Sequence, residues 1–284
     1  MQVIIGLVLV LGCSLTGFVL SGGQLLSLWH PFEILIICGA SLGAMVISNP
    51  LKVSIGVMTS TGKLLSKSPF SKEFYLELLA LLFEIFNKMR REGLIAIEAD
   101  IEEPENSPIF TKYPTIMKDH HAIEFITDYL RIMVVGDMSA HELENLMDVE
   151  LEVHHHESLA VPTAIQGVAD GLPGFGIVAA VMGIVITMGA LGGPPEILGY
   201  KVGAALVGTM LGILFAYGFA APFSAALTHK VHEEGQFYAV IKTCLIAAVH
   251  GTAPKIAVEF GRKTIPHSAR PSFEELEERV KQAK

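Results

Sequence analysis

The chain has 284 residues, 51% of them hydrophobic, and a mean hydropathy of +0.51, which excludes an ordinary soluble domain and indicates a membrane protein. Its formal net charge is −9 at pH 7, and acidic residues outnumber basic ones between residues 52 and 170, so nucleic acid is not an expected partner. The cysteines Cys13, Cys38 and Cys244 have the spacing of neither a zinc site nor a disulfide framework, and we expect no metal and no cofactor.

Two membrane-spanning helices are predicted in residues 1 to 50. Residues 1 to 21 are apolar and no basic residue precedes them, so we expect a retained transmembrane helix rather than a cleaved secretory signal. The second span is predicted from Glu33 to Ser48, where Asn49 and Pro50 stop it.

Residues 51 to 170 carry most of the charge and are predicted to form a helical cytoplasmic domain. Apolar residues recur at helical spacing from Phe74 to Met89 and from His121 to Val134. Ser139 and Glu142 have the spacing of a capping box and predict the start of a helix that continues to Glu157.

Three consecutive histidines lie near the end of that predicted helix. Adjacent residues on a helix point about 100° apart, so His154, His155 and His156 cannot all bind one metal ion. We interpret them as a solvated helix end and assign them no role.

Two longer apolar segments, Leu172 to Gly193 and Val202 to Leu227, contain no formal charge and exceed the roughly 20 residues needed to cross a bilayer. They predict third and fourth transmembrane helices within residues 171 to 228. Small residues recur every three or four positions along one side of each helix, which lets another helix approach closely. These residues are Gly176, Ala179, Gly183 and Thr187 in the first segment and Ala204, Gly208, Gly212, Ala216 and Ala220 in the second.

Each of these segments also carries a proline near its cytoplasmic end. Pro173 is predicted to open the third span, where proline costs almost nothing. Pro222 lies inside the fourth span, where it removes one backbone hydrogen bond and should bend or weaken the helix. Pro222 is therefore either a hinge or a static kink.

Residues 229 to 284 are predicted to form a cytoplasmic tail. The helix of the fourth span continues to Ala248, and Gly251 and Pro254 then break it. Ser272 and Glu275 have capping-box spacing and predict a short exposed helix. Most basic residues lie in this tail and in the central domain, which predicts that both, and hence both termini, are cytoplasmic.

Ionisable residues are missing from the predicted spans, except for Glu33 and Lys201 at their boundaries. Proton pathways through membranes usually contain such groups, so this chain alone lacks an obvious proton carrier. It offers hydroxyl groups at Thr187, Thr209 and Tyr217. We infer a scaffold that surrounds a partner supplying the carboxylate, and because no hydrolase or phosphate-loop motif is present, we do not expect an enzyme.

A stretch of mixed charge surrounds Gly93 in the central domain. Arg90 and Arg91 precede the glycine, and Glu98 and further acidic residues follow it. This stretch is either an ordinary solvated surface or a docking patch whose charges orient a complementary protein.

Three motifs resemble one known family. They are DGLPGFGIVAAVMG from Asp170 to Gly183, VGTMLGILFAYGF from Val207 to Phe219, and AVEFGRKTIPHSARPSF from Ala257 to Phe273. Through them the chain resembles, over essentially its whole length, the flagellar motor stator subunit MotA of the MotA/TolQ/ExbB proton channel superfamily, and its proton-driven branch in particular.

The resemblance implies an all-α protein of the bacterial inner membrane. It would have four transmembrane helices, a large helical cytoplasmic insertion between the second and third, a helical cytoplasmic tail and direct contact with membrane lipid. Five copies would surround two copies of MotB, whose transmembrane aspartate carries the proton and whose periplasmic part grips peptidoglycan. This complex would convert proton flow into torque on the rotor protein FliG.

The resemblance also implies roles for single residues. Pro173 and Pro222 would couple ion passage to movement. Arg90 and Glu98 would engage opposite charges on FliG, with Arg91 as an auxiliary.

Two further positions would bear on the ion. Thr209 would lie near the MotB aspartate. Ala180 stands where sodium-driven relatives carry a threonine, so one oxygen ligand is missing and protons are favoured. The alternatives are an energiser subunit like ExbB or TolQ, which has a different arrangement of spans, and a non-conducting membrane scaffold.

Overall fold

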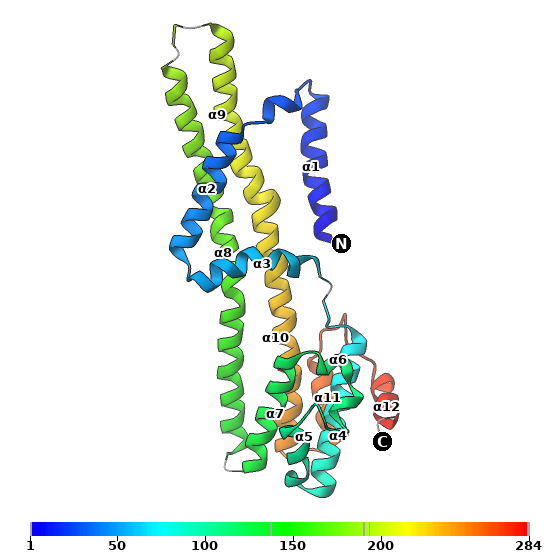
Figure 1. Ribbon diagram of the computed structural model, residues 1–284. Coiled ribbons are helices and arrows are strands. Elements are labelled where there is room, and N and C mark those ends of the chain that lie inside the picture. The colour runs from blue at the N-terminus through cyan, green and yellow to red at the C-terminus, as the bar shows by residue number, and fades with distance from the viewer. Residues whose placement is uncertain (1, 67, 137, 190, 193, 283–284) are drawn as a thin grey trace. The chain divides into compact units, whose positions relative to one another are not determined.

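The computed structural model describes residues 2–66, 68–136, 138–189, 191–192 and 194–282, and all regular secondary structure in these ranges is helical. The predicted all-α class is therefore confirmed. The chain divides into two compact units (Figure 1). Residues 1–66 and 158–229 form the first, which we call the membrane unit, and residues 67–157 and 230–284 form the second, which we call the charged unit.

The membrane unit contains the helices predicted to cross a bilayer. Among the described residues, four helical stretches are long and apolar enough to do so, as the sequence predicted. Most of their surface is apolar and exposed, and the first helix buries none of its residues. The helices that lie wholly in this unit are α1 (Gln2–Leu20), η1 (Leu25–Leu28), α2 (Pro31–Ser48), α3 (Leu51–Leu65), α9 (Pro195–Phe215) and η4 (Ala216–Ala220). Two longer helices, α8 (Ala140–Met188) and α10 (Ala221–Val249), belong to it from residue 158 onward and up to residue 229, and their other ends belong to the charged unit.

One helix replaces two predicted elements. The predicted helix from Ser139 to Glu157 does not end near the histidines, and Pro173 does not open a new helix, because α8 runs without interruption through Pro162 and Pro173. Each proline removes one backbone hydrogen bond, but the packed turns on either side keep the helix continuous. Gly193, the predicted end of the third span, lies outside the described residues.

The predicted irregularity at Pro222 is present, one turn earlier than the proline itself. Residues Ala216–Ala220 form a π-helical segment, in which the backbone N–H of Ala221 donates to the carbonyl of Ala216. Pro222 has no N–H with which to continue the regular pattern, so the widened turn absorbs the missing bond.

The charged unit is built around α4 (Lys72–Glu92), whose middle is almost entirely buried. Side chains from the insertion and from the tail share its hydrophobic core, with Tyr75, Phe110, Tyr129 and Phe237 among the largest fully buried residues. The remaining helices are η2 (Leu94–Ile97), α5 (Glu98–Glu102), η3 (Phe110–Lys112), α6 (Pro114–Met117), α7 (His120–Val135), α11 (Pro254–Thr264) and α12 (Phe273–Gln282).

Both predicted capping boxes are present. The backbone N–H of Ser139 donates to Glu142 Oε2 at 2.9 Å, and the N–H of Glu142 donates to Ser139 Oγ at 3.3 Å. The same reciprocal pair joins Ser272 and Glu275 at 2.6 and 3.1 Å. The helix that follows Ser272 was predicted to be exposed, and this prediction is wrong for one of its faces. Its Leu276 and Val280 are buried against the core of the charged unit.

Candidate functional site

The close approach of α8 and α9 dominates the membrane unit. A Cβ atom on Gly212 would lie 2.7 Å from the carbonyl oxygen of Leu172 and 2.9 Å from Cα of Gly176. Two turns further along α8, a Cβ on Gly183 would lie 3.1 Å from Cβ of Ala205. The two small-residue stripes therefore pack largely against each other within one chain, at backbone-to-backbone distance.

Two residues singled out for the ion lie beside this contact. Thr209 Cα lies 3.5 Å from the position of a Cβ on Gly176, and the backbone nitrogen of Ala180 lies 3.7 Å from that of a Cβ on Gly208. Both residues are half-buried. The helices meet so closely here that no room for an ion is left between α8 and α9 of one chain.

The structure adds Glu33, which sequence reasoning placed only at a boundary. Its Cγ lies 3.7 Å from the position of a Cβ on Gly208, its side chain is 17% exposed, and its Oε2 is 3.8 Å from Nδ1 of His30. A carboxylate thus lies at the same level as Ala180 and Gly208. The turn at the start of α2 folds it inward, which hydropathy alone does not reveal.

The other candidate pathway residues are dispersed. Thr187 is buried, and its hydroxyl donates to the carbonyl of Gly183 in its own helix at 2.7 Å. Tyr217 lies on the π-helical segment with 67% of its surface exposed. Pro222, near the start of α10, is also exposed. Pro173 lies on α8 next to Leu172, whose carbonyl faces Gly212. Ala216 is fully buried in the core of the membrane unit.

The candidate docking residues lie at the end of α4 and the start of α5. Arg90 and Arg91 occupy the last turn of α4, where cations suit the helix dipole, and Gly93 ends the helix with φ +92°. Arg90, Arg91 and Glu98 are all exposed, and none makes an ion pair with another described residue. Three charges are thus free to meet a partner.

A buried carboxylate holds the backbone behind this patch. Asp100 is 3% exposed, and it accepts hydrogen bonds from Lys88 Nζ at 2.7 Å and from Ser107 Oγ at 2.6 Å. This network ties the segment that carries Glu98 to α4, which carries Arg90 and Arg91. A buried charge is tolerated only with such partners, so the spacing of the exposed charges is set by the fold.

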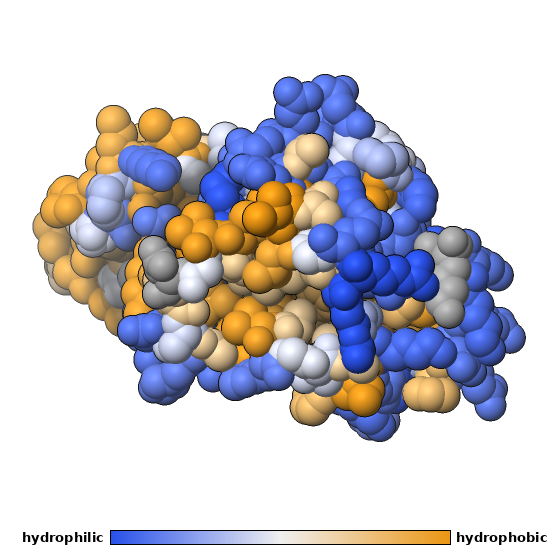
Figure 2. Space-filling view, turned by 90° about the horizontal axis from the view of Figure 1, so that it is seen from below, coloured by the Kyte–Doolittle hydropathy of each residue, from blue (hydrophilic) through white to orange (hydrophobic). Residues whose placement is uncertain are grey.

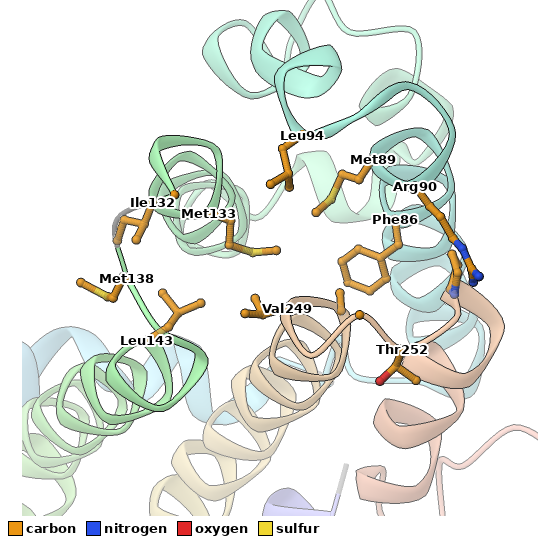
Figure 3. Close-up of a pocket in the computed structure, with 14 residues that line it drawn as sticks. Phe86, Met89, Arg90, Leu94, Ile132, Met133, Met138, Leu143, Val249 and Thr252 are labelled. Carbon is orange, nitrogen blue, oxygen red and sulfur yellow. The ribbon is translucent and has the colours of Figure 1, made fainter.

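An apolar pocket opens beside Arg90. It has a volume of about 380 Å³ and is lined from α4, α7, the start of α8 and the loop after α10. Figure 3 shows Phe86, Met89, Leu94 and Met133 directed into it, with Arg90 at its edge. Sequence reasoning missed this pocket because its lining residues come from three separate segments, residues 86–94, 132–143 and 248–254.

Other titratable groups of the charged unit serve its packing. Burial, followed by the hydrogen bond to Glu84, raises the pKa of Tyr113, and burial together with Glu150 raises that of Tyr129. Burial raises the pKa of Cys244 to about 12, which makes its thiol inert at neutral pH.

The histidines lie between α8 and α10 of the charged unit. His154 Nε2 is 3.7 Å from Glu234 Oε1, and the rings of His155 and His232 are 5.2 Å apart. No group of three metal-binding side chains gathers anywhere in the described parts of the chain.

These features define a class: a helical multi-pass membrane protein with two tightly paired helices, α8 and α9, and a charged helical unit that exposes unpaired charges at the end of α4. Two family models match the chain. Residues 4–93 match the motility protein A N-terminal model, and residues 118–239 match the MotA/TolQ/ExbB proton channel family.

Relatives that match the chain over its whole length identify the family within this class. The chain is 43% identical to motility protein A of Salmonella typhimurium, over 99% of this chain and 95% of the relative, and 42% identical to that of Escherichia coli, over 100% and 96%. The chain belongs to the motility protein A family. It is accordingly a multi-pass inner-membrane protein whose family role is ion transport for motility and not catalysis.

Solved structures agree with this assignment. A MotAB structure from C. jejuni superposes with a TM-score of 0.78 at 22% identity, covering 95% of this chain and 98% of that one, and it supports the fold. The flagellar MotAB stator complex from Bacillus subtilis superposes with a TM-score of 0.74 at 26% identity, covering 99% and 98%.

Proposed function

We propose that this protein is the flagellar stator subunit that, together with MotB, conducts protons and converts their flow into torque on the rotor protein FliG. The observation that carries the proposal is the whole-length similarity to motility protein A, at 43% identity, joined to a membrane unit of four apolar helices. The B. subtilis relative is described as a MotAB stator complex, which supports MotB as the partner.

The proposed complex contains five copies of this chain around a MotB dimer, with both termini of each copy in the cytoplasm. A proton binds the transmembrane aspartate of MotB and neutralises it. The neutral and charged forms of the MotB helix differ in affinity for the surrounding subunits, and only such a difference lets a proton bias the conformation. Successive protonations then turn the pentamer around MotB.

The proposed roles of the membrane residues follow from their positions. Thr209 and Ala180 flank the α8–α9 contact near the MotB aspartate, and Ala180 withholds the oxygen that a sodium ion would need. Pro173 in α8 and Pro222 after the π-helical segment supply the deformable points at which helix movement follows ion passage. Tyr217, exposed beside Pro222, and the buried Thr187 complete the proposed set.

In the same proposal, Arg90, Arg91 and Glu98 contact FliG. Their exposure and their lack of an ion-pair partner among the described residues support this role, because unpaired exposed charges orient a complementary surface. Rotation of the charged unit then moves the rotor.

Swimming in a strain without its own stator tests the function. This chain is expressed with its cognate MotB, and wild type is compared with Pro173→Ala and Arg90→Glu while a protonophore is titrated at constant sodium. We expect wild type to swim, the protonophore to stop it, and both changes to impair swimming while the protein stays in the membrane. A wild-type protein that reaches the membrane and gives no motility would exclude the stator function.

An energiser subunit like ExbB or TolQ is the related alternative, since the second family model includes those proteins. The match of residues 4–93 to the motility protein A N-terminal model favours the stator.

A further inference from the structure

One hydroxyl of the membrane unit forms a hydrogen bond between two helices. Ser224, near the start of α10, is 5% exposed, and its Oγ donates to the carbonyl oxygen of Pro162 in α8 at 2.8 Å. Pro162 is buried as well. Thr228 lies one turn further along α10, and its hydroxyl instead donates to the carbonyl of Ser224 in its own helix at 3.0 Å. The hydrogen bond from Ser224 therefore connects α8 to α10, and we call it the Ser224–Pro162 tie.

A third helix holds the same part of α8. A Cβ atom on Gly56 of α3 would lie 2.9 Å from Cγ2 of Val161, the residue before Pro162. A larger residue at this position would push the two helices apart, so close packing depends on the glycine. A proline also leaves one carbonyl of the preceding turn without its usual N–H partner. The tie and the contact with α3 thus fix α8 at a point where its own bonding is weakest.

The tie lies between the deformable points of the membrane unit and the charged unit. In α8, Pro173 lies about 16 Å along the helix from the tie. In α10, the π-helical segment and Pro222 directly precede the tie. On its other side, α8 up to residue 157 and α10 from residue 230 belong to the charged unit. Figure 2, which views the molecule from below, shows hydrophilic residues around a smaller apolar area, as expected of a surface that meets water.

The tie is distant from the residues proposed to act on the ion. Ala180 lies about 27 Å along α8 from Pro162. A change at the tie therefore leaves the surroundings of the ion in place. Hydrogen bonds between helices in a membrane are of modest strength, so a single one sets the register of two helices without making them rigid.

We propose that Ser224 is a positioning residue for torque, because its bond to Pro162 keeps α8 and α10 in register while the motor works against a load. The inference rests on the proposed function, and it deepens that function by assigning a residue to the transmission of movement. With the tie, movement at Pro173 and at the π-helical segment reaches the charged unit through both helices together. Without the tie, α10 slips along α8 under load, and part of each step is lost.

The torque that each complex adds to a motor tests this role. Cells without their own stator express this chain with its cognate MotB, and the rotation of a bead on a flagellum is recorded as complexes join the motor one by one. Ser224→Thr and Ser224→Val have nearly the same shape, and only threonine keeps a hydroxyl group. At high load we expect the torque increment of Ser224→Val to be about twofold or more below that of Ser224→Thr.

Two further comparisons accompany this one. At low load the two variants should rotate the bead at speeds within about a fifth of each other, because little force then acts to make the helices slip. Thr228→Val is the matched control, since it removes a hydroxyl of the same helix that bonds only within that helix. We expect its torque increment to equal that of wild type.

The possible outcomes separate the tie from the proposed function. Equal increments for Ser224→Thr and Ser224→Val would overturn the tie, and so would fewer complexes that each add a normal increment, because a defect of assembly alone changes their number. The stator function stands in both cases. If wild type adds no torque with its cognate MotB, the proposed function itself fails.

Ser224→Ala decides the question if the larger side chains keep both variants out of the membrane, because alanine is smaller than serine and fits. A lowered increment at a normal unfolding temperature would support the tie. A normal increment would overturn it.

Discussion

The two units of this protein differ in how far polar contacts join one element to another. In the membrane unit, most side-chain hydroxyls donate to a carbonyl three or four residues earlier in the same helix, as Ser41 does to Ile37 and Thr187 to Gly183. In the charged unit, hydroxyls such as those of Thr127 and Thr243 do the same, but side-chain contacts also join different elements, as Lys112 and Tyr113 do with Glu84, and Lys242 with Asp148.

The difference follows from the solvent that each unit meets. In lipid, hydroxyls bonded to their own helix do not hold helices together, and association depends on close packing of small residues such as Gly212 and Gly176. In water, burial of apolar side chains drives association, and ion pairs between elements set their register. Among the described residues, no recorded side-chain hydrogen bond joins α8 to α9, so their contact depends on packing, whereas α10 is joined to α8 by the hydrogen bond from Ser224 Oγ to the carbonyl of Pro162 at 2.8 Å.

The largest expected effect comes from Gly212→Ala in the membrane unit. The added methyl group would meet the carbonyl of Leu172 and Cα of Gly176, and backbone atoms cannot rotate away. We expect a loss of about 3 kcal/mol or more, measured by thermal unfolding in detergent, together with loss of swimming. Gly203→Ala on the same helix is the control, because nothing lies within 4 Å of its added methyl. Equal stability of the two variants would contradict the close pairing.

Gly261→Ala is the counterpart in the charged unit. Its methyl would collide with Cys244 Sγ, and Leu79 Cδ2 and Val240 Cγ1 lie 3.3 and 3.4 Å away. We expect a loss of about 2 kcal/mol in the free energy of unfolding. Here the obstacle is a side chain, so Cys244→Ala in the same protein should recover at least half of that loss. If the double variant is no more stable than Gly261→Ala, the collision is not the cause.

A smaller effect is expected at the start of α8, where Ser139→Ala removes an N-cap. The cost should be about 1 kcal/mol, and hydrogen exchange in the first turn of the helix measures it. Hydrogen bonds from Ser139 lower the pKa of Glu142 below its ordinary value of 4.5. The contribution of this carboxylate is therefore complete above pH 4.5 and is lost as the pH falls through the lower folded-state pKa.

The matching measurement compares exchange at pH 7 and at pH 3. Wild type should lose protection of the first turn of α8 at the lower pH, whereas Ser139→Ala should lose less, because its carboxylate has fewer bonds to break. The same pH dependence in both proteins would show that the capping box does not link the helix to this carboxylate.

The smallest effect is expected from Thr187→Val. This change tests whether a hydroxyl bonded within its own helix contributes to the stability of the membrane unit. Its hydroxyl bonds only to its own helix, and valine has nearly the same shape, so we expect a stability change within about 0.5 kcal/mol. Unfolding in detergent gives the number. A loss above about 1.5 kcal/mol would mean that this hydroxyl does hold helices together.

Features carried by neighbouring residues could be predicted from the sequence. The two capping boxes depend on residues three positions apart, and the four apolar spans depend on composition over about 20 residues. Both kinds of feature are present in the structure. The stripes of glycine and alanine were also readable, since helical spacing places them on one side of each segment.

Features that depend on distant segments could not be predicted. The sequence analysis predicted two helices, one continuing to Glu157 and one starting at Pro173, because local rules treat a proline as a helix start. In the structure α8 is one helix that continues through Pro173. The inward fold of Glu33 against Gly208, and the pocket beside Arg90, bring together residues far apart in the chain.

By itself, the sequence determined the helical class, the four apolar spans, the small-residue faces and the family motifs, because each depends on residue type and short-range spacing. Only the tertiary structure decided that the small-residue stripes of α8 and α9 pack against each other, that the tail completes the core of the insertion, and that an apolar pocket opens beside Arg90. The physical reason is that close packing depends on the shapes of surfaces brought together from distant parts of the chain, which periodicity along one segment does not specify.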